Sequence, residues 1–551
     1  MNFLSYMRCQ KSSSFVFFFV LILLISAGDL IFFIKTRQFL LAFIDVLACY
    51  AFFLLPIYFF KKHLKLYTWI LLPIILIAPF NALAIIFFDV PINDATILLI
   101  LNTNYAEAFE LLKGYFLIFV SSLLVYCGLY FLLICKIPNQ ITVKSASFIS
   151  ILSISTLCLL PFGSFSKFPY FDRLKGTFYF VFPTSVIYAG GAVYKQHKLM
   201  NNSKTERNNF TFKAKQVTKL PGSQVYLLII GESSRFSNWG INGYEKNTSP
   251  CLSKRTNFLS FSNASSGGFI TEFAVPLILT GVGADYFETH FKQKSIVSAF
   301  KEAGFTTYWI TNQIDDGHIK IHLEEADNKK LLLSDFKSTK HVHRDMELVE
   351  ALKKVLAEPG NKKFIVMHTS GSHYDYSARY PDEFDTFKPS NKSVFTQSSD
   401  YKNKNIIINS YDNSILYTDA VIDSSISLIA HKNAYSSVTY ISDHGDNLFD
   451  DSRNLSQHGY PYPSQYISHI PYFVWYSDSL QKRFPEKIEN LKKHINADIS
   501  SENVIYTVSS IGNVWYPKQD SSKNIASPYF KDSQQRILGA NMKVYNCKSL
   551  K

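Results

Sequence analysis

The sequence predicts an α-helical membrane domain followed by a soluble α/β domain, in which helices flank a mostly parallel sheet. Two observations lead to this fold class. Hydrophobic residues make up 47% of the 551 residues, and the excess is concentrated before residue 165. After residue 200, short strand-like apolar runs alternate with helical segments. This alternation is typical of a parallel sheet covered by helices on both faces.

Five apolar stretches approach or reach the roughly 20 residues that a helix needs to cross a bilayer. We expect transmembrane helices at residues 14–35, 39–60, 66–88, 115–135 and 146–162. The first stretch is too long for a cleaved signal peptide, and further spans follow it at once. Residues 1–163 are therefore expected to form a transmembrane domain of five helices.

The charges in the loops predict the orientation of these spans. Lys and Arg gather before the first span, between the second and third, and between the fourth and fifth, whereas Lys35 and Arg37 depart from this pattern. The loop between the third and fourth spans is acidic. Because basic loops stay in the cytoplasm, five spans place everything after residue 163 outside.

Residues 164–223 are expected to join the two domains. The apolar stretch 178–193 could form a sixth span, which would return the rest of the chain to the cytoplasm. Its Pro183, its Gly190-Gly191 pair and its aromatic residues favour a helix lying on the membrane surface instead. Residues 200–223 are polar and rich in lysine, as in a linker. The α/β domain is then expected to occupy residues 224–551.

The net charge of +13 favours contact with anionic lipids, since we find no nucleic-acid recognition motif. The seven cysteines contain no Cys-x-x-Cys pair, so a thiolate metal site is not expected. Only Cys251 and Cys547 lie in the soluble part, which allows at most one disulfide there. Whether these two pair is left open.

Polar residues follow two of the predicted strands, where ligands of α/β sheets gather. Glu232 comes directly after the run 224–231, and Asp443 and His444 follow the run 437–442. Carboxylates and imidazoles in such positions suit a metal ion. Each also has an ordinary alternative, as a helix-start residue, a cap or a surface histidine. Asp446 could be a further ligand or a helix-start residue.

Thr271 lies in a segment of small residues that precedes a predicted helix start, which offers N–H groups to a phosphate. A threonine hydroxyl bound to a metal loses its proton more easily and becomes a nucleophile. From the residues alone, Ser265, Ser266 or Thr280 could serve equally well. Glu272 is most simply a carboxylate in the first turn of the helix.

Two histidines, His373 and His458, each lie close to a glycine in a polar loop. They could bind a second metal, or donate hydrogen bonds to phosphoryl oxygens or to a leaving group. His341 and His343 compete for this role, but they follow a run of Lys and Ser and are interpreted as surface residues.

The order of these motifs resembles the phosphoethanolamine transferases of the alkaline phosphatase and sulfatase superfamily. The resemblance covers nearly the whole chain, including the five spans. Within the family it is strongest to the branch that modifies the heptose core of lipopolysaccharide. The motifs are Gly231-Glu232-Ser233, the threonine segment ending in Val275-Pro276, Gly371-Ser372-His373, Ser442-Asp443-His444-Gly445, His458-Gly459, and the segments 102–111, 304–313 and 411–419.

The resemblance implies an alkaline phosphatase/sulfatase-like fold and a zinc ion (Zn²⁺) bound by Glu232, Thr271, Asp443 and His444. It makes Thr271, five residues before Pro276, the nucleophile. It implies a multi-pass protein of the bacterial inner membrane with its catalytic domain in the periplasm. The residues that it implies for substrate binding are His373 and His458 at the phosphoethanolamine group, and Thr103, Asn104 and Glu107 at the lipid donor.

The implied reaction moves phosphoethanolamine from phosphatidylethanolamine to a lipopolysaccharide acceptor, either core heptose or lipid A, through a phospho-threonine intermediate. Members that modify lipid A carry cysteines around the nucleophile, where this chain has Gly267 and Leu277, so the core-modifying branch is favoured. Two alternatives stay open: a phosphoglycerol transferase that uses phosphatidylglycerol, and a catalytically inactive membrane-anchored scaffold. A true sulfatase is disfavoured because the Cys/Ser-x-Pro-x-Arg signature is absent.

Overall fold

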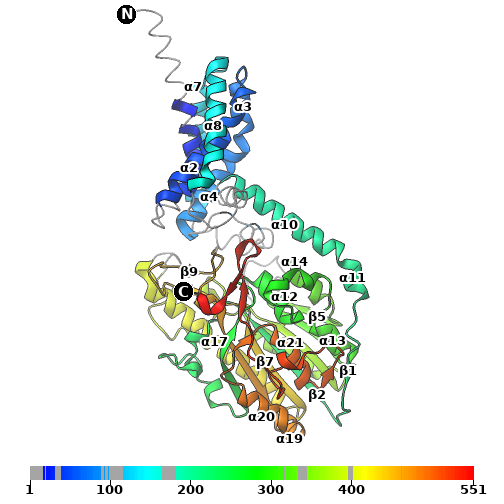
Figure 1. Ribbon diagram of the computed structural model, residues 1–551. Helices are drawn as coiled ribbons and strands as arrows, with labels where there is room; N and C mark the ends of the chain where they lie inside the picture. Colours follow the sequence, from blue (N-terminus) through cyan, green and yellow to red (C-terminus); the bar gives the residue numbers. More distant parts are fainter. Residues whose placement is uncertain are drawn as a thin grey trace, which may run out of the picture. The chain divides into compact units, whose positions relative to one another are not determined.

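The structure is a computed structural model that describes residues 16–18, 20–31, 39–88, 92, 97, 116–163, 182–313, 317–332, 344–394, 401–460 and 462–550. The chain divides into two compact units, Met1–Tyr194 and Lys195–Lys551. The first is helical and the second is α/β (Figure 1). The donor-loop residues Thr103, Asn104 and Glu107, and the histidines His341 and His343, lie outside the described residues.

The first unit consists of apolar helices. They are a helical stretch within residues 16–31, α2 (Phe39–Leu54), η1 (Leu55–Tyr58), α3 (Leu64–Ile70), α4 (Leu72–Phe88), α7 (Phe116–Lys136) and α8 (Val143–Gly163). Each of the five expected spans overlaps described helices of this unit. Among the described helices, α7 is by itself long and apolar enough to cross a membrane, and α3 with α4 forms a second such stretch that bends by 45°. Five complete spans stay a prediction.

The connecting region is more regular than the sequence suggested. Helix α10 (Thr184–Asn202) begins later than the apolar stretch at 178 and continues beyond it. The expected linker then contains α11 (Lys204–Asn209) and strand β1 (Lys215–Gln216), which pairs with β12 (Val514–Trp515). The Glu302 carboxylate also accepts hydrogen bonds from the backbone of this segment. These partners are distant in sequence, so a polar composition alone could not reveal them.

The second unit is organised around an eight-stranded sheet of order β11-β3-β10-β7-β2-β6-β4-β5. Among these strands, only β10 runs antiparallel to its neighbours. The expectation of a mostly parallel sheet is therefore confirmed, and this one strand makes the sheet mixed. The strands are β2 (Gln224–Gly231), β3 (Phe258–Ser265), β4 (Thr306–Thr311), β5 (Asn328–Leu331), β6 (Lys362–His368), β7 (Tyr435–Ser442), β10 (His469–Tyr476) and β11 (Ile499–Ser500).

Helices cover both faces of this sheet (Figure 1). Successive side chains of β2 point to opposite faces, and both sets are buried. Tyr226, Leu228 and Ile230 pack in one core with α12 (Thr271–Thr280), α13 (Ile296–Glu302) and α21 (Asn503–Ile511). The residues between them pack in a second core with α15 (Met346–Ala357) and α17 (Lys404–Ala430). The shorter helices are α14 (Gly317–Leu323), α16 (Tyr376–Arg379), α18 (Gln465–Ser468), α19 (Asp478–Arg483) and α20 (Pro485–Lys493).

The register of the central strands brings the predicted site residues to one edge of the sheet. Strand β2 lies between β6 and β7 and is parallel to both, with Ile230 opposite His368 and Gly231 opposite Ser442. The three strands therefore end at the same level. The residues that follow them, Glu232, the loop from Thr369 and Asp443, meet beyond this edge, as expected for a ligand site of an α/β sheet.

A cluster of three buried histidines lies beside α12. His318 and His322 belong to α14 and His290 to a 3₁₀ segment, η5 (Ala284–Phe291). His290 Nδ1 lies 3.5 Å from His322 Nε2, and His322 Nδ1 lies 3.0 Å from Glu325 Oε1. The backbone N–H of His318 donates to Glu272 Oε1 at 2.7 Å. Burial lowers the pKa of His290, and it lowers that of His318 to about 4 although the bond to Glu272 acts the other way.

We expect the stability of the protein to fall on acidification less steeply in a His318→Gln variant than in the wild type. The unfolded chain protonates His318 near pH 6.5, whereas the folded chain does so only near pH 4. The unfolded state therefore binds more protons between these values, and stability is lost as the pH falls through this window. The loss attributable to His318 is at most about 3 kcal/mol. Urea unfolding of the detergent-solubilised chain at about pH 7 and about pH 5 measures it.

A matched control is His431→Gln, since His431 is exposed at the end of α17. This variant should keep the wild-type dependence of stability on pH. An unchanged dependence in His318→Gln would mean that the folded protein already accepts a proton on this ring.

Candidate metal centre and active site

The hydroxyl of Thr271 lies between a carboxylate and an imidazole. Thr271 is the first residue of α12, and its Oγ1 donates to Glu232 Oε2 at 3.0 Å. The same oxygen lies 3.3 Å from His444 Nε2. Glu232 and His444 are fully buried. The structure thus brings together three residues that are separated by up to 212 positions in the sequence, counting from residue 232 to residue 444.

The other candidate hydroxyls are engaged elsewhere. Ser265 Oγ donates to Ile499 O at 3.2 Å, and Thr280 Oγ1 donates to Pro276 O at 2.6 Å. Ser266 Oγ bonds to the carbonyl oxygens of Gly268 and Asp443. Among the four hydroxyls considered from the sequence, only that of Thr271 donates to a carboxylate.

Only one of the two carboxylate oxygens of Asp443 accepts hydrogen bonds among the described residues. Its Oδ1 accepts hydrogen bonds from the backbone N–H groups of Ser233 at 3.0 Å and His444 at 2.6 Å. Its Oδ2 is buried without a hydrogen-bond partner among the described residues, and lies 3.3 Å from His444 Nε2. A buried carboxylate oxygen without a partner is costly, so its position points to a ligand that the protein itself does not provide.

The ring of His444 is oriented by its own backbone neighbourhood. Its Nδ1 lies 3.0 Å from the carbonyl oxygen of Gly445, which can only accept, so Nδ1 carries the proton. The lone pair of Nε2 then faces Thr271 Oγ1, Asp443 Oδ2 and Glu232 Oε1, at 3.3, 3.3 and 3.6 Å. Ligands of one tetrahedral zinc ion lie about 3.3 Å apart. These four residues therefore fit a divalent cation.

The charges of the cluster also favour a cation. Burial, followed by the charge of Glu232, raises the pKa of Asp443 to about 7. Burial would raise the pKa of Glu232 as well, but the neighbouring imidazoles of His444, His373 and His458 hold it at about 2. Burial would lower the pKa of His444, but the two carboxylates raise it. Two buried carboxylates side by side need positive charge, which a divalent cation supplies.

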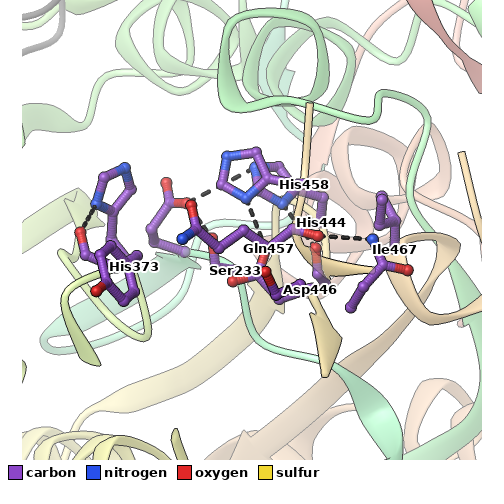
Figure 2. A network of polar contacts seen from close by, with 12 residues as sticks. Ser233, His373, His444, Asp446, Gln457, His458 and Ile467 are labelled. Atoms are coloured by element: carbon purple, nitrogen blue, oxygen red, sulfur yellow. Dashed lines mark hydrogen bonds and ion pairs between the residues drawn. The ribbon is translucent and has the colours of Figure 1, made fainter. Parts of the chain in front are cut away.

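His458, the second histidine of the cluster, is held by Asp446, whose role the sequence left open. His458 Nδ1 donates to Asp446 Oδ1 at 2.6 Å, and Tyr376 donates to the other oxygen of Asp446 at 2.7 Å. Asp446 is therefore a partner of His458 and starts no helix. Ligand atoms of Glu232, His444 and His458 all lie within 4.8 Å of one another. Figure 2 shows the rings of His444 and His458 side by side.

His373 lies apart from the other two histidines (Figure 2). Its ring centroid is 6.2 Å from that of His458, compared with 4.2 Å between His444 and His458. Its Nδ1 donates to Tyr374 O at 2.7 Å, which leaves Nε2 for a ligand. His373 therefore borders the cluster without joining it.

Sequence reasoning missed Gln313. Its Nε2 donates to Glu232 Oε2 at 2.9 Å and to Thr369 O at 3.1 Å. Gln313 thus shares Glu232 Oε2 with the hydroxyl of Thr271. Its place after the end of β4, at the edge where β2 also ends, is the signal that could have identified it. Cys251 and Cys547 are both unpaired.

This fold and this cluster define an enzyme-like α/β domain with a candidate metal centre at the ends of parallel strands. The chain belongs to the sulfatase family, whose model matches residues 224–514. Its relatives include phosphoethanolamine transferase EptC of Escherichia coli K12, 24% identical over 90% of this chain and 88% of that protein. Phosphoethanolamine transferase EptA of E. coli O157:H7 is 25% identical over 76% of this chain and 78% of that protein.

Solved structures show the same fold. The integral membrane protein EptA of Neisseria meningitidis matches with a TM-score of 0.75 and 21% identity, over 93% of this chain and 98% of that one. This coverage includes the helical first unit. The periplasmic domain of E. coli EptC in complex with zinc matches with a TM-score of 0.55 and 23% identity, over 61% of this chain and 96% of that one.

We expect Asp443→Asn to stabilise the metal-free protein and to destabilise it relative to the wild type once Zn²⁺ is added. The substitution removes an unpartnered buried charge beside Glu232, a gain of about 1–3 kcal/mol. With zinc present, the loss of one ligand reverses the order. Thermal unfolding at about pH 8, where a carboxyl with the pKa of Asp443 is mostly ionised, compares chelator-treated and zinc-loaded protein.

The control is Asp412→Asn, which also removes a buried carboxylate, but one that accepts from Lys246 Nζ at 2.7 Å. This variant should be less stable than the wild type with and without zinc. If Asp443→Asn behaves like Asp412→Asn in both conditions, Asp443 is not a ligand.

Proposed function

We propose that this protein is a zinc-dependent phosphoethanolamine transferase. It would move phosphoethanolamine from phosphatidylethanolamine to a lipopolysaccharide acceptor through a covalent intermediate on Thr271. The observation that carries the proposal is the position of Thr271 Oγ1, 3.0 Å from Glu232 Oε2 and 3.3 Å from His444 Nε2. The names of the relatives, which match most of the chain, support the transferred group.

Glu232, Thr271, Asp443 and His444 would hold the zinc ion, since oxygen and imidazole ligands suit it. The zinc complex of the E. coli EptC domain supports this choice of metal. Bound zinc supplies positive charge that lowers the pKa of a neighbouring hydroxyl and offsets negative charge in the transition state. His373 and His458 are left for the phosphoethanolamine group or for a second zinc ion.

In the first step, Thr271 Oγ1 attacks the phosphorus and the bond to the diacylglycerol oxygen breaks. The proton of Thr271 leaves along its hydrogen bond to Glu232. The leaving oxygen takes a proton from His458, whose ring is oriented by its hydrogen bond to Asp446. In the second step, the acceptor oxygen attacks the phosphorus and gives its proton to His458, while the bond between the phosphorus and Thr271 Oγ1 breaks and Oγ1 takes back its proton from Glu232. The N-terminal end of α12 favours the negative phosphoryl group throughout.

The helical first unit would anchor the protein in the membrane and so keep the site close to its lipid substrate. Five spans with the N-terminus inside would place the catalytic domain in the periplasm of a bacterial inner-membrane protein. Thr103, Asn104 and Glu107 in the outer loop would help to bind the lipid donor. No nucleic acid is expected as a partner.

Loss of the Thr271 hydroxyl should abolish the reaction with the donor. We expect Thr271→Ala to release diacylglycerol from phosphatidylethanolamine at least about 10³-fold more slowly than the wild type, because the variant lacks the hydroxyl that contacts both Glu232 and His444. The assay uses purified protein in detergent with labelled lipid. Without acceptor, the wild-type peptide that contains Thr271 should gain the mass of one phosphoethanolamine group.

Thr280→Ala is the control, since this hydroxyl lies in the same helix but bonds to Pro276 O. Release of diacylglycerol by Thr271→Ala at the control's rate would exclude the covalent step. If the wild type consumes phosphatidylglycerol instead, the protein is a phosphoglycerol transferase. If it consumes neither lipid, the protein is an inactive scaffold. Mass spectrometry of lipopolysaccharide from cells with wild-type or Thr271→Ala protein then locates the group on core heptose or lipid A.

The orientation makes a separate prediction. Alkaline phosphatase fused after residue 200 should be active in cells, because that reporter needs an oxidising compartment to form its disulfides. A reporter that works only in the cytoplasm, fused at the same residue, should be inactive. The opposite pair of results would mean that residues 178–193 cross the membrane as a sixth span.

A further inference from the structure

A buried carboxylate outside the metal cluster, Asp345, holds two parts of the site. Asp345 is 4% exposed and precedes α15. Its Oδ1 accepts from the backbone N–H of Ser370 at 2.9 Å and from Asn312 Nδ2 at 3.2 Å. Its Oδ2 accepts from the backbone N–H of Gly371 at 2.8 Å. One side chain thus binds segments that follow two different strands, β4 and β6.

The position of Asp345 suggests a helix cap, but its side chain does not act as one. Asp before a helix usually accepts a hydrogen bond from the N–H groups of the first turn. The Asp345 carboxylate makes no such bond to α15. Both of its oxygens are directed to the loop after β6 and to Asn312 instead. The Asp345 side chain therefore does not stabilise the start of α15.

The loop after β6 is fixed between Asp345 and the metal cluster. Gly371 has a φ of +46° and lies so close to Glu232 that an added Cβ would be 2.7 Å from Glu232 O. Ser372 N donates to the same carbonyl oxygen at 2.9 Å. The next residue is His373, so the position of this ring depends on both anchors. The loop can shift neither toward nor away from Glu232 without breaking a hydrogen bond or creating a clash.

The contact with Asn312 extends this control to the other side of Glu232. Asn312 N donates to His368 O at 3.1 Å, and Ser370 Oγ donates to Asn312 O at 2.8 Å. The following residue, Gln313, donates to Glu232 Oε2. Asp345 therefore sets the relative positions of the strand ends that lead to Gln313 and His373.

We propose that Asp345 is a positioning residue for the transfer reaction, acting through the loop 370–373 and Asn312 on Glu232 and His373. The inference rests on the proposed function for its catalytic readout. It requires no contact of Asp345 with substrate or metal. It predicts that a small displacement of this carboxylate lowers both the zinc affinity and the transfer rate of a folded protein.

Asp345→Asn keeps the size of the side chain but turns one acceptor into an N–H group that faces a backbone donor. We expect its kcat/KM for phosphatidylethanolamine and its zinc affinity each to fall about 10–100-fold, the usual effect of losing support for ligand residues. Zinc affinity is measured by competition with a chelator, using the full chain in detergent. Should this variant fail to fold, Asn312→Ala removes one of the three donors and should lower the same two quantities less.

Asp419→Asn is the matched control. Asp419 is fully buried in α17 and accepts from the backbone N–H groups of Cys251 and Leu252 at 2.8 and 3.0 Å, away from the site. We expect it to lower the melting temperature by a similar amount, with kcat/KM and zinc affinity within about twofold of wild type. Equal activity and zinc losses in the two variants would show that Asp345 acts only through stability and would overturn the proposal.

A double-mutant cycle with His373→Ala tests the route. If Asp345 acts through the loop, Asp345→Asn should cost much less activity in the His373→Ala background than in the wild type, whereas fully additive losses would contradict it. Failure of the proposed function gives a different pattern. In that case the wild type consumes no phosphatidylethanolamine, and the zinc affinities of Asp345→Asn and Asp419→Asn still decide whether Asp345 positions the metal cluster.

Discussion

The structure depends on the placement of two buried carboxylates, Glu232 and Asp443, at the ends of adjacent parallel strands. Both are fully buried, and among the described residues one oxygen of Asp443 has no hydrogen-bond partner. Charges in this arrangement repel each other and have lost their hydration, so the arrangement is stable only with nearby positive charge. This demand explains why the surrounding groups converge on a space suited to a cation.

The sheet is what makes this convergence precise enough for chemistry. Because β7, β2 and β6 are parallel and in register, the loops after them begin at one level. Backbone hydrogen bonds then join the loops directly: Ser233 N to Asp443 Oδ1, and Ser372 N to Glu232 O. Ser266 ties the segment before Thr271 to the carbonyl of Asp443. Thr271 and the two carboxylates therefore belong to one hydrogen-bonded unit, in which the strands fix the positions of the loops.

Local signals predicted part of the fold and missed another part for physical reasons. The bounds of β2 match the predicted run 224–231, and β7 ends at the predicted residue 442, since buried parallel strands are continuous apolar segments with clear ends. Strand β3 was missed because serine and asparagine alternate with its apolar residues. Strand β10 contains Pro471, which argues against a central strand, and the register with β3 shifts around this proline. Pairing with both neighbours outweighs the local preference.

By itself, the sequence determined which residue types follow the buried strands, and hence that carboxylates, imidazoles and a hydroxyl suited to a metal are present. Strand ends and motif order are properties of short segments, so they can be recognised without coordinates. Only the tertiary structure decided that Thr271, among four hydroxyls, contacts Glu232, that Asp446 supports His458, and that Gln313 and Thr271 share one oxygen of Glu232. Hydrogen bonds between segments that are far apart in the chain depend on how the strands are ordered in the sheet, and no local pattern encodes that order.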